Sequence, residues 1–159
     1  MEVKTCMKPS FTVIGKEGST KDGKQFIQKL WQEANAHFAE VAPLAKKDAQ
    51  GHFAGFWGAM SDMSRSFLPW QNHFSEGLYL AGVECDDEAE APAGWTKWVI
   101  PGYEYLCAEV SGPETFTEMM TYLKENHISL AGAVHDFTDP KTQKNYMYFP
   151  IKRIEEAEA

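Results

Sequence analysis

Residues 95–112, WTKWVIPGYEYLCAEVSG, constrain the fold more than any other stretch of the sequence. Pro101 and Gly102 would interrupt a helix, whereas the aromatic and β-branched residues around them suit a pleated strand. Alternation along such a strand places Tyr103, Tyr105, Cys107 and Glu109 on one face and Glu104, Leu106, Ala108 and Val110 on the other. We therefore predict one long central strand whose second set of side chains faces a core.

Glu104 stands at the start of the otherwise apolar row of this strand. A glutamate there lies either in water at the rim of the sheet or inside the protein for a purpose, because an unpaired glutamate is rarely buried. A one-residue slip, or a bulge near Gly102, would exchange the two faces of the strand. The sequence thus leaves open whether Glu104 or Glu109 faces a binding site.

The remaining elements are expected on both sides of this strand. Before it, we predict strands at 11–15, 53–60 and 78–85, and a helix whose apolar stripe runs from Phe26 to Val41. After it, we predict a helix with a stripe from Phe116 to Leu123 and strands at 130–137 and 145–151. Residues 1–10 are interpreted as a polar leader, 61–76 as a long connection and 86–90 as a solvated acidic loop.

The order of these elements is βαββ followed by βαββ, over residues 10–90 and 95–153. Gly15 and Gly112 are both expected to end a strand before a helix, and a duplicated unit would give such repetition. We predict one α+β domain over residues 1–159, in which two βαββ units meet about a pseudo-twofold axis. A ligand cleft would follow that axis.

Charge and composition limit the partners of the protein. The net charge is −8 without a run of Lys or Arg, which disfavours direct nucleic-acid binding. The three cysteines lack CxxC spacing and the five histidines lack ligand spacing, so we expect no disulfide framework, no metal and no cofactor. No apolar span approaches membrane length. We expect a cytoplasmic monomer or homodimer that does not contact a membrane.

Three segments, GLYLAGVECDD, PAGWTKWVIPGYEYLCAEVSG and NYMYFPIKR, resemble the gyrase-inhibitor-like (GyrI-like) small-molecule-binding family in this order around the second helix. That family also supplies effector domains of AraC-type and MerR-type multidrug-responsive regulators. The resemblance spans Phe11 to Arg153. It implies the duplicated fold and a central pocket for bulky, often cationic, aromatic compounds, walled by aromatic residues around an acid. We expect a free-standing module, because the chain lacks room for a helix-turn-helix segment.

The last strand departs from the family pattern. In effector domains of the family it often carries an acid two residues before its final tyrosine, and Tyr146 stands at that place here. Because a tyrosine stands where the family has that acid, we consider Glu104 and Glu109 as candidates for the acid of the pocket. Tyr105 falls on the family's usual strand tyrosine, which supports the register.

We expect the ligand to contact strand aromatics and one of the two glutamates. The predicted set is Trp57, Trp70, Tyr79, Trp98, Tyr103, Glu104, Tyr105, Glu109, Tyr146 and Tyr148. A ring that faces a cation contributes about 0.5–2 kcal/mol. As alternatives, the tyrosines are ordinary half-buried strand residues, and Trp70 is either a lid or a loop anchor.

Three functions follow from this set. The leading hypothesis is a cytosolic protein that binds bulky, hydrophobic, cationic aromatic compounds. The alternative, suggested by stand-alone members of the family, is a hydrolase of cyclopropanoid-type natural products. In it Glu104 would align a water molecule and Tyr146 would hydrogen-bond a carbonyl that gains charge. A third hypothesis is a protein that interacts with gyrase or a regulator through its acidic surface.

Overall fold

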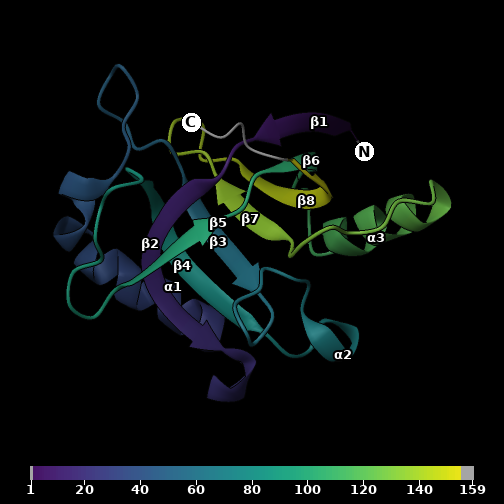
Figure 1. Ribbon diagram of the computed structural model, residues 1–159, viewed down its shortest axis with the longest axis horizontal. Helices are drawn as coiled ribbons and strands as arrows, with labels where there is room; N and C mark the ends of the chain where they lie inside the picture. Colours follow the sequence, from purple (N-terminus) through teal and green to yellow (C-terminus); the bar gives the residue numbers. More distant parts are fainter. Residues whose placement is uncertain (1, 155–159) are drawn as a thin grey trace.

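Among the described residues, every strand pair is antiparallel, and the eight strands join into one sheet (Figure 1). The computed structural model describes residues 2–154. The strands are β1 (Val3–Lys8), β2 (Phe11–Ser19), β3 (Phe56–Ser61), β4 (Leu78–Cys85), β5 (Thr96–Ile100), β6 (Tyr103–Glu109), β7 (His135–Thr138) and β8 (Asn145–Arg153). The α-helices are α1 (Phe26–His37), the four-residue α2 (Gln71–Phe74) and α3 (Thr115–Glu125), and short 3-10 helices span Thr20–Asp22, Phe38–Glu40 and Ala42–Leu44. The mixed α+β class is therefore confirmed.

The strand order is β1-β6-β8-β7-β3-β4-β2-β5, so the two βαββ halves meet where β7 pairs with β3. One half comprises β2, α1, β3 and β4, and the other comprises β6, α3, β7 and β8. The outer strand of each half comes from the segment that precedes the other half in the sequence. β1 precedes β2 but pairs with β6, and β5 precedes β6 but pairs with β2. The halves are thus joined both at the centre of the sheet and by exchanged edges.

The prediction of one strand over 95–112 is wrong. Residues 96–100 form β5 at one edge of the sheet, whereas residues 103–109 form β6 near the opposite edge. Pro101 has no N–H to donate to a ladder, and a side chain on Gly102 would approach the Ser10 backbone nitrogen to 3.2 Å. These two residues therefore end one strand and allow the chain to cross to the other half.

Several other boundaries differ from expectation. Residues 3–8 form β1 rather than a leader, because they pair with β6. Gly15 does not end a strand but lies in the middle of β2, directly opposite Gly82 of β4. The strands expected from residues 53 and 130 begin at Phe56 and His135, where pairing with a neighbour begins.

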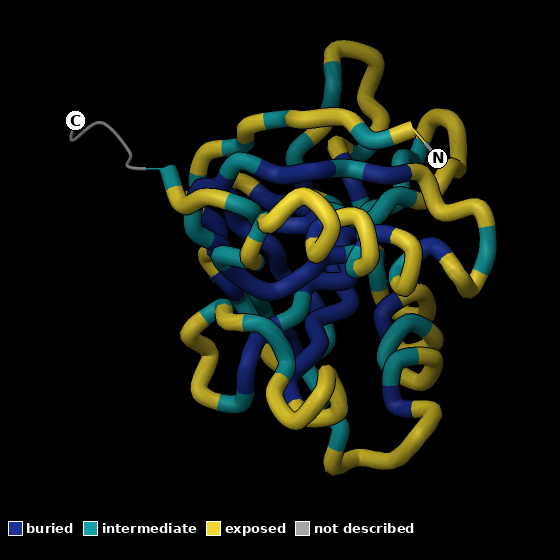
Figure 2. Tube along the Cα trace, turned by 90° about the vertical axis from the view of Figure 1, so that its right-hand side faces the viewer, coloured by how far each residue is buried: buried dark blue, intermediate teal, exposed yellow. Residues whose placement is uncertain are grey.

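The sheet separates an aromatic core on one face from two helix-covered cores on the other. Under α1 lie Ile14, Ala81 and Val83, and under α3 lie Leu106, Ala108 and Phe149. The opposite face bears the aromatic core, which contains Phe11, Trp57, Trp98, Tyr103, Tyr105, Phe137 and Tyr148. In Figure 2 the buried trace follows the strands, whereas the exposed trace follows loops and the outer sides of the helices. Within residues 2–154, no helix combines the length and hydropathy needed to cross a bilayer.

Candidate functional site

Two cavities lie on opposite faces of the sheet. The helix-side cavity has a volume of about 240 Å³ and lies where the two halves meet. Its lining consists of Met60, Trp70, Phe74, Phe116, Val134, Asp136 and Met147. The open-side cavity has a volume of about 900 Å³, and its lining includes Cys6, Cys107, Phe137, Tyr146 and Tyr148, together with charged residues such as Lys4, Glu109 and Lys144.

Asp136 is the single charged residue of the helix-side lining. It lies on β7 opposite Gly58 of β3, at the joint between the halves. Its Oδ2 accepts a long hydrogen bond from the Tyr79 hydroxyl at 3.4 Å. The Trp31 Nε1 group in turn donates to the Tyr79 oxygen at 3.0 Å. Gly58 makes this arrangement possible, because a Cβ atom there would overlap the Tyr79 hydroxyl.

Desolvation dominates the electrostatics of this carboxyl group. Burial raises the pKa of Asp136 to about 6, although the Tyr79 hydrogen bond acts in the opposite direction. Within residues 2–154, no lysine, arginine or histidine forms an ion pair with Asp136. At neutral pH the side chain is therefore mostly ionised in apolar surroundings without a counter-charge.

Two other inward-facing carboxylates, those of Glu84 and Glu17, are already neutralised by ion pairs. Glu84 is buried on the opposite face, where Lys8 Nζ lies 3.1 Å from its Oε1 and Trp57 Nε1 donates to the same atom at 3.1 Å. Glu17 forms an ion pair with Arg65 and accepts a hydrogen bond from Trp98 Nε1 at 2.8 Å. Both acids form ion pairs within the protein and are therefore not free to bind a ligand cation.

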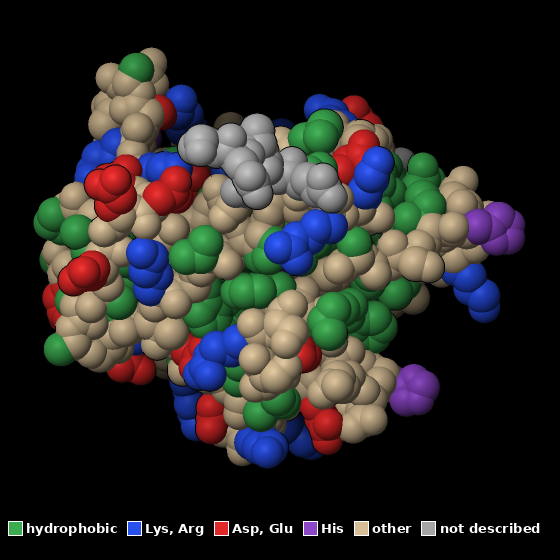
Figure 3. All heavy atoms as spheres, in the orientation of Figure 1, with side chains coloured by type: hydrophobic (Ala, Val, Ile, Leu, Met, Phe, Trp, Pro, Cys, Tyr) green, Lys and Arg blue, Asp and Glu red, His purple; other side chains and the backbone are tan. Residues whose placement is uncertain are grey.

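The helix-side cavity is covered by the segment around α2. Trp70 packs near Phe26, with ring centroids 6.3 Å apart, and donates from Nε1 to the Leu78 carbonyl at 2.9 Å. Phe74 meets Phe116 of α3 edge to face at 5.4 Å. Figure 3 shows hydrophobic side chains gathered between α2 and α3. The cavity therefore has aromatic walls from both halves.

The backbone of this cover is strained. Asn72, His73 and Phe74 have φ values of 51°, 59° and 62°, in the left-handed region. A left-handed turn of L-residues costs roughly 1–2 kcal/mol per residue. The α2 segment is therefore a strained left-handed turn.

The predicted site residues are divided between these places. Tyr79 and Trp70 lie at the helix-side cavity. Glu109, Tyr146 and Tyr148 line the open-side cavity, and Trp57, Trp98, Tyr103 and Tyr105 belong to the aromatic core. The Tyr105 hydroxyl is buried there without a hydrogen-bond partner among the described residues.

Glu104 is separated from the other predicted residues. Because Tyr103 and Tyr105 both point into the aromatic core, Glu104 between them points to the helix side of the sheet. Its ladder partners are Met7 and Lys152, and it lines neither cavity. Glu104 and Tyr146 thus lie on opposite faces.

Asp136 was missed by the sequence analysis, which assigned residues 130–137 to a strand without weighing its single acid. The sequence feature that could have identified Asp136 is its position between His135 and Phe137 in a strand. Alternation places its side chain on the face opposite those two rings. The sequence did not reveal that this face lies under the contact between the two halves. Across the described part of the chain, no three His, Cys, Asp or Glu side chains are grouped closely enough to hold a metal ion.

Comparison with solved structures supports the fold. SAV2435, described as bound to tetraphenylphosphonium, has a TM-score of 0.69 and 17% identity over 96% of this chain and 94% of that one. The C-terminal domain of EcmrR has a TM-score of 0.64 and 14% identity, covering 96% and 98%. A hydrolase from Listeria innocua has a TM-score of 0.56 and 12% identity, covering 95% and 92%. At these identities the likeness extends to the fold alone.

No curated protein sequence matches the chain. The family model of integron-associated effector binding proteins, Cass2, matches residues 6–132. This match covers most of the chain, and together with the structural neighbours it confirms the GyrI-like resemblance. The protein therefore has an effector-binding fold for small molecules, and it belongs to the Cass2 family of integron-associated effector binding proteins.

Proposed function

We propose that this protein binds hydrophobic organic cations in the helix-side cavity, with Asp136 as the counter-charge. The observation that carries the proposal is a carboxylate with one long hydrogen bond at the base of an otherwise apolar cavity. Burial of an unpaired charge is unfavourable, and an organic cation would remove that penalty. A neutral compound of the same shape would leave the carboxylate unpaired.

The walls suit the same class of ligand. Trp70, Phe74 and Phe116 offer ring faces or edges to a ligand above Asp136. A cation near one ring gains about 0.5–2 kcal/mol, whereas an uncharged group gains only its apolar contact. The tetraphenylphosphonium bound to SAV2435 supports a cationic ligand for this fold, although the two chains share 17% identity.

The size of the cavity limits the ligand in the closed conformation. Its volume of about 240 Å³ lies below the range of about 300–1,000 Å³ that is typical for drug-sized ligands. A single-ring ammonium compound would enter without rearrangement, whereas a bulky cation would require displacement of the α2 segment. We infer that the α2 segment, which contains the strained residues 72–74, is the part that would move.

No hydrolase is proposed. The predicted catalytic pair, Glu104 and Tyr146, lies on opposite faces of the sheet and does not meet at one substrate. The interaction hypothesis likewise gains no specific contact from the structure.

Titration calorimetry with matched ligands tests the proposal. Phenyltrimethylammonium and its neutral isostere tert-butylbenzene probe the closed cavity, and tetraphenylphosphonium and neutral triphenylphosphine oxide probe the opened one. We expect both cations to bind more tightly than their neutral counterparts. Asp136→Asn should weaken cation binding about a hundredfold, because loss of a buried charge partner costs about 2–5 kcal/mol. Equal binding of cations and neutral compounds, unchanged by Asp136→Asn, would refute a role for this carboxylate.

A further inference from the structure

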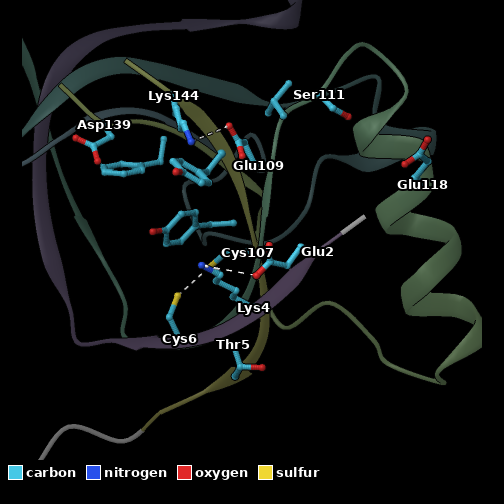
Figure 4. Close-up of a pocket in the computed structure, with 14 residues that line it drawn as sticks. Glu2, Lys4, Thr5, Cys6, Cys107, Glu109, Ser111, Glu118, Asp139 and Lys144 are labelled. Carbon is cyan, nitrogen blue, oxygen red and sulfur yellow. Dashed lines mark hydrogen bonds and ion pairs between the residues drawn. The ribbon is translucent and has the colours of Figure 1, made fainter. Parts of the chain in front are cut away.

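The open-side cavity contains a pair of thiols that the proposed function does not use. Cys6 of β1 and Cys107 of β6 are diagonal neighbours on the same face, since Cys6 lies opposite Tyr105 and Cys107 lies opposite Lys4. Their Sγ atoms are 2.8 Å apart, and both residues are half-buried and unbonded. Figure 4 shows the two side chains pointing at each other at the wall of the cavity.

We propose that Cys6 and Cys107 form an oxidative modification site, at which a hydroperoxide converts the two thiols into an intramolecular disulfide. Cys6 is the attacking thiol and Cys107 is the resolving thiol. This inference is independent of the cation site, because the two sulfurs lie on the other face of the sheet.

The cavity gives the oxidant access to the sulfurs. Both cysteines line a space of about 900 Å³ whose rim bears charged side chains, including the ion-paired Lys144 and Glu109 (Figure 4). Hydrogen peroxide is small and polar, so it can enter with water. Redox-sensitive cysteines typically combine such exposure with thiolate character and a nearby resolving thiol.

The shared hydrogen bond gives the two sulfurs different roles. The contact with Cys107 lowers the pKa of the Cys6 thiol, desolvation opposes this effect, and Lys8 adds to it. The same contact, followed by burial, raises the pKa of the Cys107 thiol. Cys6 is therefore the more readily ionised thiol of the pair and the one that attacks first.

The chemistry balances without another co-reactant. The Cys6 thiolate attacks one peroxide oxygen, the O–O bond breaks, and hydroxide leaves as Cys6 becomes a sulfenic acid. The Cys107 sulfur then attacks the Cys6 sulfur, forms the S–S bond and releases the sulfenic oxygen as water, with its own proton lost to that leaving group. The two thiols are oxidised together and one peroxide is reduced.

The position of β1 allows the bond to close. A disulfide has an S–S length of about 2.05 Å, so the sulfurs must approach each other by less than about 1 Å. Diagonal positions lie about 7–8 Å apart, beyond the Cα separation of about 4.4–6.8 Å that is usual for a disulfide, so closure requires a shift of the backbone. Since β1 is an edge strand that pairs with β6 alone, it can slide to accommodate the bond. Oxidation would therefore fasten β1 to the wall of the open-side cavity.

Cys85 provides an internal control. It is fully buried on the helix side, under α1, and its thiol donates a hydrogen bond to the Val83 carbonyl. Burial raises the pKa of Cys85 to about 11. It should resist a peroxide concentration that oxidises the other two thiols.

The test treats the reduced full-length protein with hydrogen peroxide, removes the oxidant, unfolds the protein and alkylates the free thiols. Intact mass and peptide mapping should show one alkylated residue, Cys85, and a Cys6–Cys107 disulfide that dithiothreitol reverses. Cys107→Ser should stop the reaction at a Cys6 sulfenic acid that dimedone traps. In Cys6→Ser, Cys107 should stay reduced at the same peroxide concentration, and Cys85→Ser should oxidise as the unchanged protein does.

Three results would overturn the proposal. The first is equal alkylation of all three cysteines in the folded protein after a peroxide treatment that is strong enough to oxidise the urea-unfolded chain fully. The second is a disulfide between two molecules, seen as a covalent dimer. The third is a dimedone adduct that forms at Cys107 in Cys6→Ser as fast as at Cys6 in Cys107→Ser, because the thiols would then have no distinct roles.

Discussion

The two cavities are built from the same strands yet have opposite chemical character. On β7 and β8, Asp136 and Met147 point to the helix side, whereas Phe137, Tyr146 and Tyr148 point to the open side. The helix-side cavity has one acid without a cationic partner, while Glu109 on the open side is exposed and lies 3.8 Å from Lys144. The comparison shows that the surroundings of an acid, more than its presence, decide whether it can bind a ligand cation.

The largest effect expected from this contrast is on the pH dependence of stability. A pKa raised from 3.8 to about 6 means that the folded protein holds the Asp136 proton more tightly than the unfolded chain does. The contribution of Asp136 to stability is therefore greatest below about pH 4 and falls, by roughly 3 kcal/mol, as pH rises through about 6. Asp136→Asn should remove this decline and be the more stable protein at neutral pH. Urea denaturation of both proteins across this range measures the difference.

Glu109→Gln serves as the control for that experiment, because it removes an acid from the other cavity. Its curve of stability against pH should follow that of the unchanged protein. If Asp136→Asn also follows it, the carboxyl group is not desolvated and the contrast between the cavities fails.

Gly58→Ala should have the next largest effect. The added methyl group would overlap the Tyr79 hydroxyl and lie 3.2 Å from the Asp136 Cβ, so we expect a loss of about 1–3 kcal/mol in stability. Combining it with Tyr79→Leu should reduce this loss, since the obstructing ring is then absent. Thermal unfolding of the four proteins measures the coupling, and strictly additive effects would argue against the Tyr79 position described above.

Phe74→Leu tests the aromatic wall of the helix-side cavity. Loss of a ring should weaken binding of phenyltrimethylammonium by about 0.5–2 kcal/mol, with a smaller effect on tert-butylbenzene. Phe137→Leu, which removes a ring from the other cavity, is the matched control and should leave cation binding unchanged. A larger effect from Phe137→Leu would place the cation on the open side.

The smallest effect is expected from the two glutamates singled out in the sequence. Glu104→Gln and Glu109→Gln should each change cation affinity by less than about 0.5 kcal/mol, since neither residue lines the helix-side cavity and the exposed charge of Glu109 is also screened by salt. Calorimetry at low and moderate salt measures this. A tenfold loss of cation affinity in either variant would show that the substituted glutamate, and not Asp136, is the counter-charge of the ligand.

Much of the fold could be predicted because it depends on local patterns. The apolar stripe that starts at Phe116 lies in α3, and the alternation in residues 103–109 correctly placed Tyr105 and Leu106 on opposite faces. The stripe predicted from Phe26 to Val41 lies only partly in α1, because the helix ends at His37 and the chain continues in short 3-10 turns. The error lay in continuity, because Pro101 and Gly102 were interpreted as part of a strand. Pairing partners lie far apart in the chain, and alternation does not show which edge a segment joins.

The candidate site was less predictable for a related reason. Tyr79 and Trp70 were predicted as ligand contacts and lie at the helix-side cavity, but the acid beside them was not identified. Asp136 meets Tyr79 across 57 residues of chain, and Gly58 provides the space between them from a third strand. Cys6 and Cys107 likewise approach each other only because β1 crosses to the other half.

The sequence by itself determined the two main helices, most of the strands and the alternation of side chains along residues 103–109, because these follow from side-chain periodicity and backbone sterics. Only the tertiary structure decided that Asp136 has no cationic partner among the described residues and that Cys6 and Cys107 meet. A pKa, an ion pair or a contact between thiols depends on distances and desolvation in three dimensions. These are set by how the two halves pair at β3 and β7 and exchange their outer strands.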